Sequence, residues 1–255
     1  MIRRTVQTDG AAARGWVGKI LKVIGTSIAH GEEGRRAAGG RPAAPAREES
    51  YVLPPWAIKA VRLVLHALFR LCFGLRLKGT ENIPREGGLV VAANHQSYFD
   101  PFWIAAPFTR QLRFLAWDAV FGWPVLGGLI RLLGAWPLQT QKSDARAIRQ
   151  SVQWLRGGGA LVIFPEGGRC LADGEMLPLK PGAARLALET NVPVLPVTIR
   201  GGHRVWPRGR KWPRLGRVEI VYHPPLRMTQ LPGEDTRACA RRETERLAEI
   251  IASGL

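Results

Sequence analysis

Short apolar runs alternate along most of the chain with longer segments in which apolar residues recur at helical spacing. Six of these runs predict β-strands, at residues 75–79, 88–93, 111–116, 159–164, 194–199 and 217–222. The other segments predict helices at residues 101–107, 119–133, 143–156, 181–189 and 235–252, with Ser143 and Asp235 as N-caps. Apolar strands that alternate with helices predict an α/β fold, in which helices flank a mostly parallel sheet.

The first 50 residues have a different pattern. Residues 15–29 place apolar side chains on one side of a helix, which is typical of a helix in a membrane interface or of a tail helix docked on its own domain. A segment rich in Gly, Ala, Pro and charge follows, as in a linker. We therefore expect a basic, partly disordered tail with an amphipathic segment at residues 1–50, and a folded domain at residues 51–255.

The folded domain opens with a strongly apolar segment at residues 51–74. Its cationic positions recur at intervals of three and four residues, at Lys59, Arg62, His66 and Arg70. This spacing predicts an amphipathic membrane-associating helix whose long cationic side chains reach lipid headgroups. A core helix with one solvent-exposed face is the alternative. The equally apolar stretch at residues 119–136 favours the membrane interpretation.

Composition and charge limit the class of protein. An apolar content of 46% in 255 residues is enough for a hydrophobic core, so the chain is not disordered as a whole. The net charge is +17, from 37 Lys and Arg against 20 Asp and Glu, which indicates a polyanionic partner. Anionic lipid surfaces and nucleic acids both have that property.

The sequence carries weak signals for compartment. Cys72, Cys170 and Cys239 are too few and too scattered for a disulfide framework or a thiolate metal site, so we interpret them as reduced and cytosolic. The basic N-terminus is not followed by an uninterrupted apolar region and a cleavage site, so a secretory signal is not expected. A run of eighteen uncharged apolar residues does not occur, which disfavours a spanning helix.

A polar turn follows the strand predicted at residues 88–93. It contains His95 and, five positions later, Asp100, which would start the next helix. Open α/β folds place their sites at the carboxyl ends of strands, where Asp100 could accept a hydrogen bond from one imidazole nitrogen of His95. Such a pair indicates a general base and its orienting carboxylate. The alternative is an Asp N-cap beside a partly exposed histidine, and the pair alone leaves both open.

A second polar turn, FPEGGRC, follows the strand predicted at residues 159–164. Its backbone N–H groups and Arg169 would suit an anion, since a guanidinium can bind a phosphate through two parallel hydrogen bonds. A tight turn closed by a surface ion pair between Glu166 and Arg169 is the alternative.

Taken together, the two turns resemble the signature of the glycerolipid acyltransferase family, that of the 1-acylglycerol-3-phosphate acyltransferases. The segment NHQSYFD matches the family's Asn-His-x-x-x-x-Asp motif in full. The segment FPEGGRC matches Phe-Pro-Glu-Gly-Thr-Arg-Ser except at Gly168 and Cys170. The blocks LKPGAARLA, with Lys180, and VPVLPVTI agree in order, so the likeness covers residues 75–225.

The resemblance implies transfer of a fatty acyl group from acyl-CoA or acyl carrier protein to the free hydroxyl of a lysophospholipid, in phospholipid biosynthesis. His95 would deprotonate that hydroxyl, and Asp100 would hold the imidazole tautomer. Residues implied in binding the substrate are Asn94, Glu166, Gly167, Gly168, Arg169 and Lys180. The resemblance implies no metal, cofactor or covalent intermediate.

One block departs from the family pattern. Many members carry Gly-x-x-Phe-Ile-x-Arg between the two motifs, with an arginine that helps to bind the acceptor phosphate, and here Thr140 stands at that position. Lys142 or Arg146 could substitute for it. The expected acceptor is 1-acylglycerol-3-phosphate, and a different lysolipid, such as a lyso-ornithine lipid, is the alternative.

Residues 200–217 contain seven Lys or Arg side chains interleaved with Trp206 and Trp212. Such a segment is typical of a protein on anionic lipid and also of a single-stranded nucleic-acid groove, and a solvated loop is a third interpretation. The amphipathic segments favour lipid. We therefore expect peripheral or monotopic attachment to the cytoplasmic side of a membrane, with the bacterial inner membrane as the expected location and nucleic acid as an unlikely partner. A non-catalytic binding module is the alternative.

Overall fold

The computed structural model describes residues 55–117, 121–122, 126–132, 134–138, 145–170, 174–210 and 212–255. The predictions for the tail at residues 1–50, and those for Thr140, Lys142 and Ser143, lie outside these residues. The predicted boundary at residue 51 also lies outside the described residues.

The described strands form one seven-stranded sheet in the order β1-β7-β6-β2-β5-β3-β4. The strands are β1 Arg76–Lys78, β2 Leu89–Ala93, β3 Leu112–Trp117, β4 Ala135–Leu138, β5 Ala160–Ile163, β6 Val194–Arg200 and β7 Glu219–Tyr222. All pairs are parallel except β6 with β7. The sheet is therefore mostly parallel, with β1 and β7 running against the other five strands.

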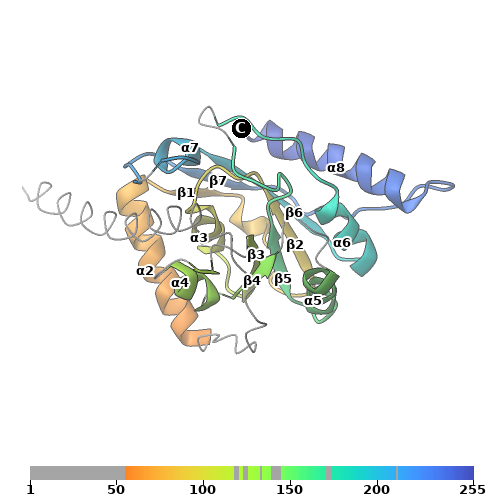
Figure 1. The fold of residues 1–255 in the computed structure, drawn as a ribbon, viewed down its shortest axis with the longest axis horizontal. Coiled ribbons are helices and arrows are strands. Elements are labelled where there is room, and N and C mark those ends of the chain that lie inside the picture. The colour runs from red at the N-terminus through yellow and green to blue at the C-terminus, as the bar shows by residue number, and fades with distance from the viewer. Residues whose placement is uncertain are drawn as a thin grey trace, which may run out of the picture.

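Helices cover both faces of this sheet (Figure 1). They are α2 Pro55–Phe73, the 3-10 helix η1 Thr80–Asn82, α3 Asp100–Ala105, α4 Leu126–Leu132, α5 Ala145–Arg156, α6 Gly182–Thr190, α7 Gly202–Val205 and α8 Thr236–Ser253. Alternate residues of the central strand β2 contribute to two hydrophobic clusters. Val91 packs with α2 and α3 on one face, and Val90 packs with α5, α6 and α8 on the other.

The predicted α/β class is confirmed, and each predicted strand and its observed counterpart agree to within two residues at both ends. Of the helix predicted at residues 119–133, the structure describes α4 at Leu126–Leu132, whereas residues 119–120, 123–125 and 133 lie outside the described residues. Strand β4 and the short helix α7 were not predicted. Pro137 interrupts the apolar run of β4, and the fold tolerates it there because β4 is an edge strand.

Helix α2 lies within the segment at residues 51–74, and it confirms the prediction that this segment is helical. Its buried face carries Phe69 and Phe73, whose rings lie within 5.5–6.2 Å of Phe99 and Trp103. The side chains of Lys59 and Arg62 are outside the description. Large apolar side chains also remain exposed on this helix, namely Trp56, Leu63, Val64 and Leu71.

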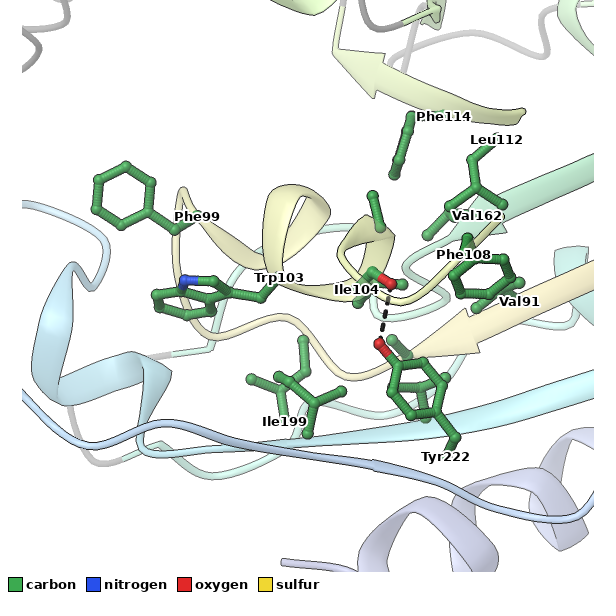
Figure 2. Packing of buried hydrophobic residues seen from close by; sticks show 14 of the residues in the cluster. Val91, Phe99, Trp103, Ile104, Phe108, Leu112, Phe114, Val162, Ile199 and Tyr222 are labelled. Carbon is green, nitrogen blue, oxygen red and sulfur yellow. Dashed lines mark hydrogen bonds between the residues drawn. The ribbon is translucent and has the colours of Figure 1, made fainter. Parts of the chain in front are cut away.

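A buried hydrogen bond anchors the helix that carries the first motif. The hydroxyl of Tyr222, on β7, donates to the backbone carbonyl of Ile104, on α3, at 2.9 Å. Figure 2 shows this bond among the buried side chains of the first cluster. Because the tyrosine is 1% exposed, this contact fixes α3 against the sheet in a region that excludes water.

Candidate active site

The first motif begins where β2 ends, and its first residue anchors the following loop. The side chain of Asn94 is buried and makes both of its hydrogen bonds to one residue of the neighbouring strand β6. Its amide nitrogen donates to the carbonyl of Ile199 at 3.0 Å, and its amide oxygen accepts from the N–H of Ile199 at 2.7 Å. Asn94 therefore continues the sheet pairing by one residue and fixes the start of the loop.

His95 and Asp100 form the predicted pair. The distance between His95 Nδ1 and Asp100 Oδ2 is 2.8 Å, and Asp100 is completely buried in the first turn of α3. The same carboxylate oxygen accepts the backbone N–H groups of Gln96 and Ser97, at 2.6 and 2.7 Å. A carboxylate that accepts from Nδ1–H leaves Nε2 of the imidazole as the proton acceptor.

The surroundings of His95 keep its imidazole neutral. Burial lowers the pKa of His95 most, the positive charge of Arg169 lowers it further, and the hydrogen bond and charge of Asp100 oppose both effects. The ring of Phe164 stacks on the imidazole with centroids 4.0 Å apart and planes inclined by 19°. A neutral, oriented imidazole at neutral pH can accept a proton from a bound hydroxyl.

The second motif holds the backbone of His95 from both sides. The carboxylate of Glu166 accepts the N–H of His95 at 2.6 Å through Oε1 and the N–H of Leu177 at 2.7 Å through Oε2. The N–H of Cys170 donates to the carbonyl of His95 at 2.8 Å. Burial raises the pKa of Glu166 to about 7, against the opposite effect of the two N–H donors.

The remaining predicted site residues lie around the same turn. Gly167 has a φ of +71°, and a Cβ there would lie 2.6 Å from Nζ of Lys180. The guanidinium carbon of Arg169 lies 3.4 Å from the centre of the Tyr98 ring. Gly168 has open space at its Cβ position, and Lys180 is exposed.

The structure thus brings the predicted residues of the two motifs together, but the contacts of Asn94 and Glu166 differ from the predicted contacts with substrate. The side-chain hydrogen bonds described above for Asn94 and Glu166 go to backbone groups of the protein. Gly167 and Lys180 are exposed, and Gly168 and Arg169 are partly exposed. Arg146, suggested as a substitute for the missing arginine, is exposed near the start of α5.

Sequence reasoning missed Gln96, which lies within the first motif. Its side chain is buried, accepts the N–H of Gly202 at 2.9 Å, and donates to the carbonyl of Gly174 at 3.1 Å. A Cβ at Gly202 would lie 3.0 Å from Gln96 Cβ and 3.2 Å from Asp100 Oδ1, so a larger residue would crowd both side chains. The sequence signal that could have identified this residue is its polar side chain within the first motif.

Within the described residues, His, Cys, Asp and Glu side chains do not form a group of three that could hold a metal ion. No disulfide joins the three cysteines, all of which are described.

The chain matches a known protein family. Residues 74–200 match the family model described as "Acyltransferase". The chain belongs to this acyltransferase family. Its strands β1 to β6 and both motifs lie within the matched region.

Two relatives are named as 1-acyl-sn-glycerol-3-phosphate acyltransferases. The Brassica napus protein, chloroplastic by name, is 29% identical over 154 residues, which are 59% of this chain and 44% of that protein. The Bacillus subtilis protein is 24% identical over 188 residues, 73% of this chain and 91% of that protein. The chain spans less than half the length of the chloroplastic relatives that it matches.

A solved structure has the same fold. The crystal structure of the 1-acyl-sn-glycerophosphate acyltransferase PlsC from Thermotoga maritima superposes with a TM-score of 0.63. The match covers 95% of this chain and 90% of that one at 24% identity. This likeness supports the α/β fold described above.

Proposed function

We propose that this chain transfers a fatty acyl group from a thioester, acyl-CoA or acyl carrier protein, to the free hydroxyl of a lysophospholipid. The observation that carries the proposal is the hydrogen bond between His95 Nδ1 and the buried Asp100 carboxylate, in a loop that both motifs hold in place. The names of the relatives favour 1-acylglycerol-3-phosphate as the acceptor.

In the proposed reaction, Nε2 of His95 takes the proton of the acceptor hydroxyl as its oxygen attacks the thioester carbonyl. Asp100 stabilises the imidazolium that forms, and the imidazolium then returns the proton to the departing thiolate. The new ester bond forms as the carbon–sulfur bond breaks, so atoms and charge balance. General-base assistance of this kind contributes roughly 10²–10⁴ in rate.

The acyl group is proposed to pass directly between the substrates. Ser97, the hydroxyl residue within the first motif, is completely buried, and its Oγ accepts the N–H of Phe99 at 3.3 Å. Cys170, at the end of the second motif, is 1% exposed. Buried groups of this kind are poorly placed to attack a thioester, which supports direct transfer to the acceptor.

The turn of the second motif is the proposed binding place of the acceptor head group. Arg169 and Lys180 supply positive charge at its rim, and the open space at Gly168 gives access. Asn94 and Glu166 would then act as positioning residues, since they hold the loop that carries His95.

Helix α2 is the proposed membrane contact. On this helix, the side chains of Trp56, Leu63 and Leu71 are 73%, 71% and 76% exposed. Burial of apolar groups of this size in the interface of a bilayer is favourable. Among the described helices, we find none with the length and apolar character needed to cross a membrane. We propose peripheral attachment to an anionic surface, on the cytoplasmic side of the bacterial inner membrane.

The experiment is thioester consumption by the purified chain in mixed micelles. Lysophosphatidic acid, lyso-ornithine lipid and lysophosphatidylethanolamine are offered separately, and His95→Ala is assayed beside the wild type. We expect turnover with lysophosphatidic acid that falls by roughly 10²-fold or more in His95→Ala. Turnover with a different acceptor alone would reassign the head group.

The comparison also needs a test that His95→Ala is folded. The flotation of His95→Ala with anionic vesicles should equal that of the wild type, which shows that the variant is folded and still binds lipid. Absence of turnover with every acceptor, or equal turnover by wild type and variant, would contradict the proposed reaction. It would favour a module that only binds lipid or nucleic acid.

A further inference from the structure

A hollow of about 540 Å³ lies apart from the turn of the second motif. It is bounded by α7, by the beginning of β1 and by the adjoining ends of β6 and β7, which Figure 1 shows at one edge of the fold. Four arginines line it, namely Arg76, Arg200, Arg204 and Arg217, together with Glu175 and Glu219. Pockets of this volume are typical of small-molecule sites.

The positive charge of this hollow is only partly compensated. Glu219 pairs with Arg200 at 3.1 Å and with Lys78 at 2.9 Å, and the hydrogen bond from Lys78 does most to hold the pKa of Glu219 below its ordinary value. Within the described part of the chain, Arg76, Arg204 and Arg217 make no salt bridge. The charge of Arg76 also acts on Glu219, so Arg204 and Arg217 are the guanidinium groups of the hollow that have no carboxylate partner among the described residues.

One wall of the hollow belongs to the loop that carries His95. Gln96 lines the hollow, its backbone N–H donates to Asp100, and its side chain joins Gly202 to Gly174. Gly174 has a φ of +84°, and a Cβ there would lie 2.4 Å from Nδ1 of His203, so the wall is closely packed. Since Gln96 follows His95 directly, a ligand in this hollow would lie beside the candidate catalytic loop.

We propose that the hollow binds a phosphate ester. One guanidinium group can donate two parallel hydrogen bonds to the oxygens of a phosphate. An arginine without a carboxylate partner has its full charge available to bind an anion. The volume leaves room for an organic group attached to the phosphate. The proposal rests on the proposed function in one respect: the phosphate is carried by the nucleotide part of an acyl-CoA donor, or else by the head group of a membrane lipid other than the acceptor bound at the turn of the second motif.

Binding is measured without turnover, with the purified full-length chain. The probes are adenosine 3′,5′-bisphosphate, followed by calorimetry, and vesicles of phosphatidylcholine with or without phosphatidic acid, followed by flotation. The variant Arg204→Gln/Arg217→Gln removes two lining charges. Arg208→Gln is the matched control, because Arg208 is exposed in the same basic segment and does not line the hollow.

The double variant should bind the effective probe roughly 10- to 100-fold more weakly, as expected for the loss of charge-assisted hydrogen bonds, and Arg208→Gln should bind it like the wild type. A loss confined to adenosine 3′,5′-bisphosphate assigns the hollow to the donor, and a loss confined to phosphatidic acid assigns it to a lipid head group. Either result supports the site.

Equal binding by the wild type and the double variant, or binding of neither probe by the wild type, would overturn the proposal. The unfolding free energy of the double variant should match that of the wild type, since both arginines are exposed. The two proposals can fail separately. Probe binding without turnover supports this site and contradicts the proposed reaction. Turnover without probe binding supports the reaction and contradicts this site.

Discussion

The buried carboxylate of Glu166 should make the stability of the protein depend on pH in an unusual direction. Burial raises the pKa of Glu166 from its ordinary value of 4.5 to about 7. Below the lower value both the folded and the unfolded chain hold the proton, so the full stability is present. As the pH rises the unfolded chain ionises first, and stability falls until Glu166 ionises in the folded chain as well.

The size of this effect follows from the two pKa values. A difference from 4.5 to about 7 corresponds to roughly 3 kcal/mol in total, of which about 2.5 kcal/mol falls between pH 5 and pH 8. Glu166→Gln removes the titration and keeps an oxygen that can accept from only one of the two N–H donors, His95 or Leu177. The variant should be less stable than the wild type at pH 5, with the difference shrinking toward pH 8.

The assay is urea unfolding at a series of pH values from 5 to 8, for the wild type and Glu166→Gln. Subtracting one profile from the other removes the contributions of other groups, including the neutral His95. Glu189→Gln, which changes an exposed carboxylate on α6, is the control and should keep the wild-type dependence on pH. Parallel profiles for the wild type and Glu166→Gln would refute the assignment of this titration to Glu166.

Three further substitutions test contacts that position the site, each by the free energy of urea unfolding. Tyr222→Phe removes the buried bond to Ile104 and should cost roughly 1–3 kcal/mol, and an unchanged value would show that water replaces the hydroxyl. Asn94→Ala leaves the N–H and carbonyl of Ile199 unpaired and should lower the free energy of unfolding by roughly 2–4 kcal/mol. Turnover by the folded variant should fall as well, and turnover equal to that of the wild type would contradict the positioning role of Asn94. Asp235→Ala removes an N-cap that accepts two backbone N–H groups of α8 and should cost about 1 kcal/mol with no change in turnover.

The central strands of the fold were predictable because their residues are buried on both faces. Every residue of β2 is buried, and such a strand appears in the sequence as an unbroken apolar run. Strand β4 was not predictable in the same way, because it is short and contains a proline. The reversed direction of β7 depends on how it pairs with β6, which no local pattern specifies.

The sequence predicted that the residues of the two motifs would lie together, but it did not predict the contacts that each of them makes. His95 and Asp100 lie in hydrogen-bond contact as their spacing suggested. The sequence shows that Glu166 is charged and lies between a proline and a glycine, but burial of its carboxylate against the N–H of His95 depends on the packing of two distant turns. Gln96 escaped notice because its importance comes from Gly202 and Gly174, far along the chain.

The contacts of the His95 loop determine when during folding the site can exist. Asn94 is fixed by Ile199, on β6, and His95 by Glu166, after β5, so segments separated by 105 and 71 positions must meet before the loop is ordered. Contacts between such distant segments form late, since long chain loops must close first. A nascent chain that ends before residue 194 therefore contains His95 and Asp100 but lacks the strand that fixes their loop, and competence for chemistry would arrive only with the last central strand of the sheet.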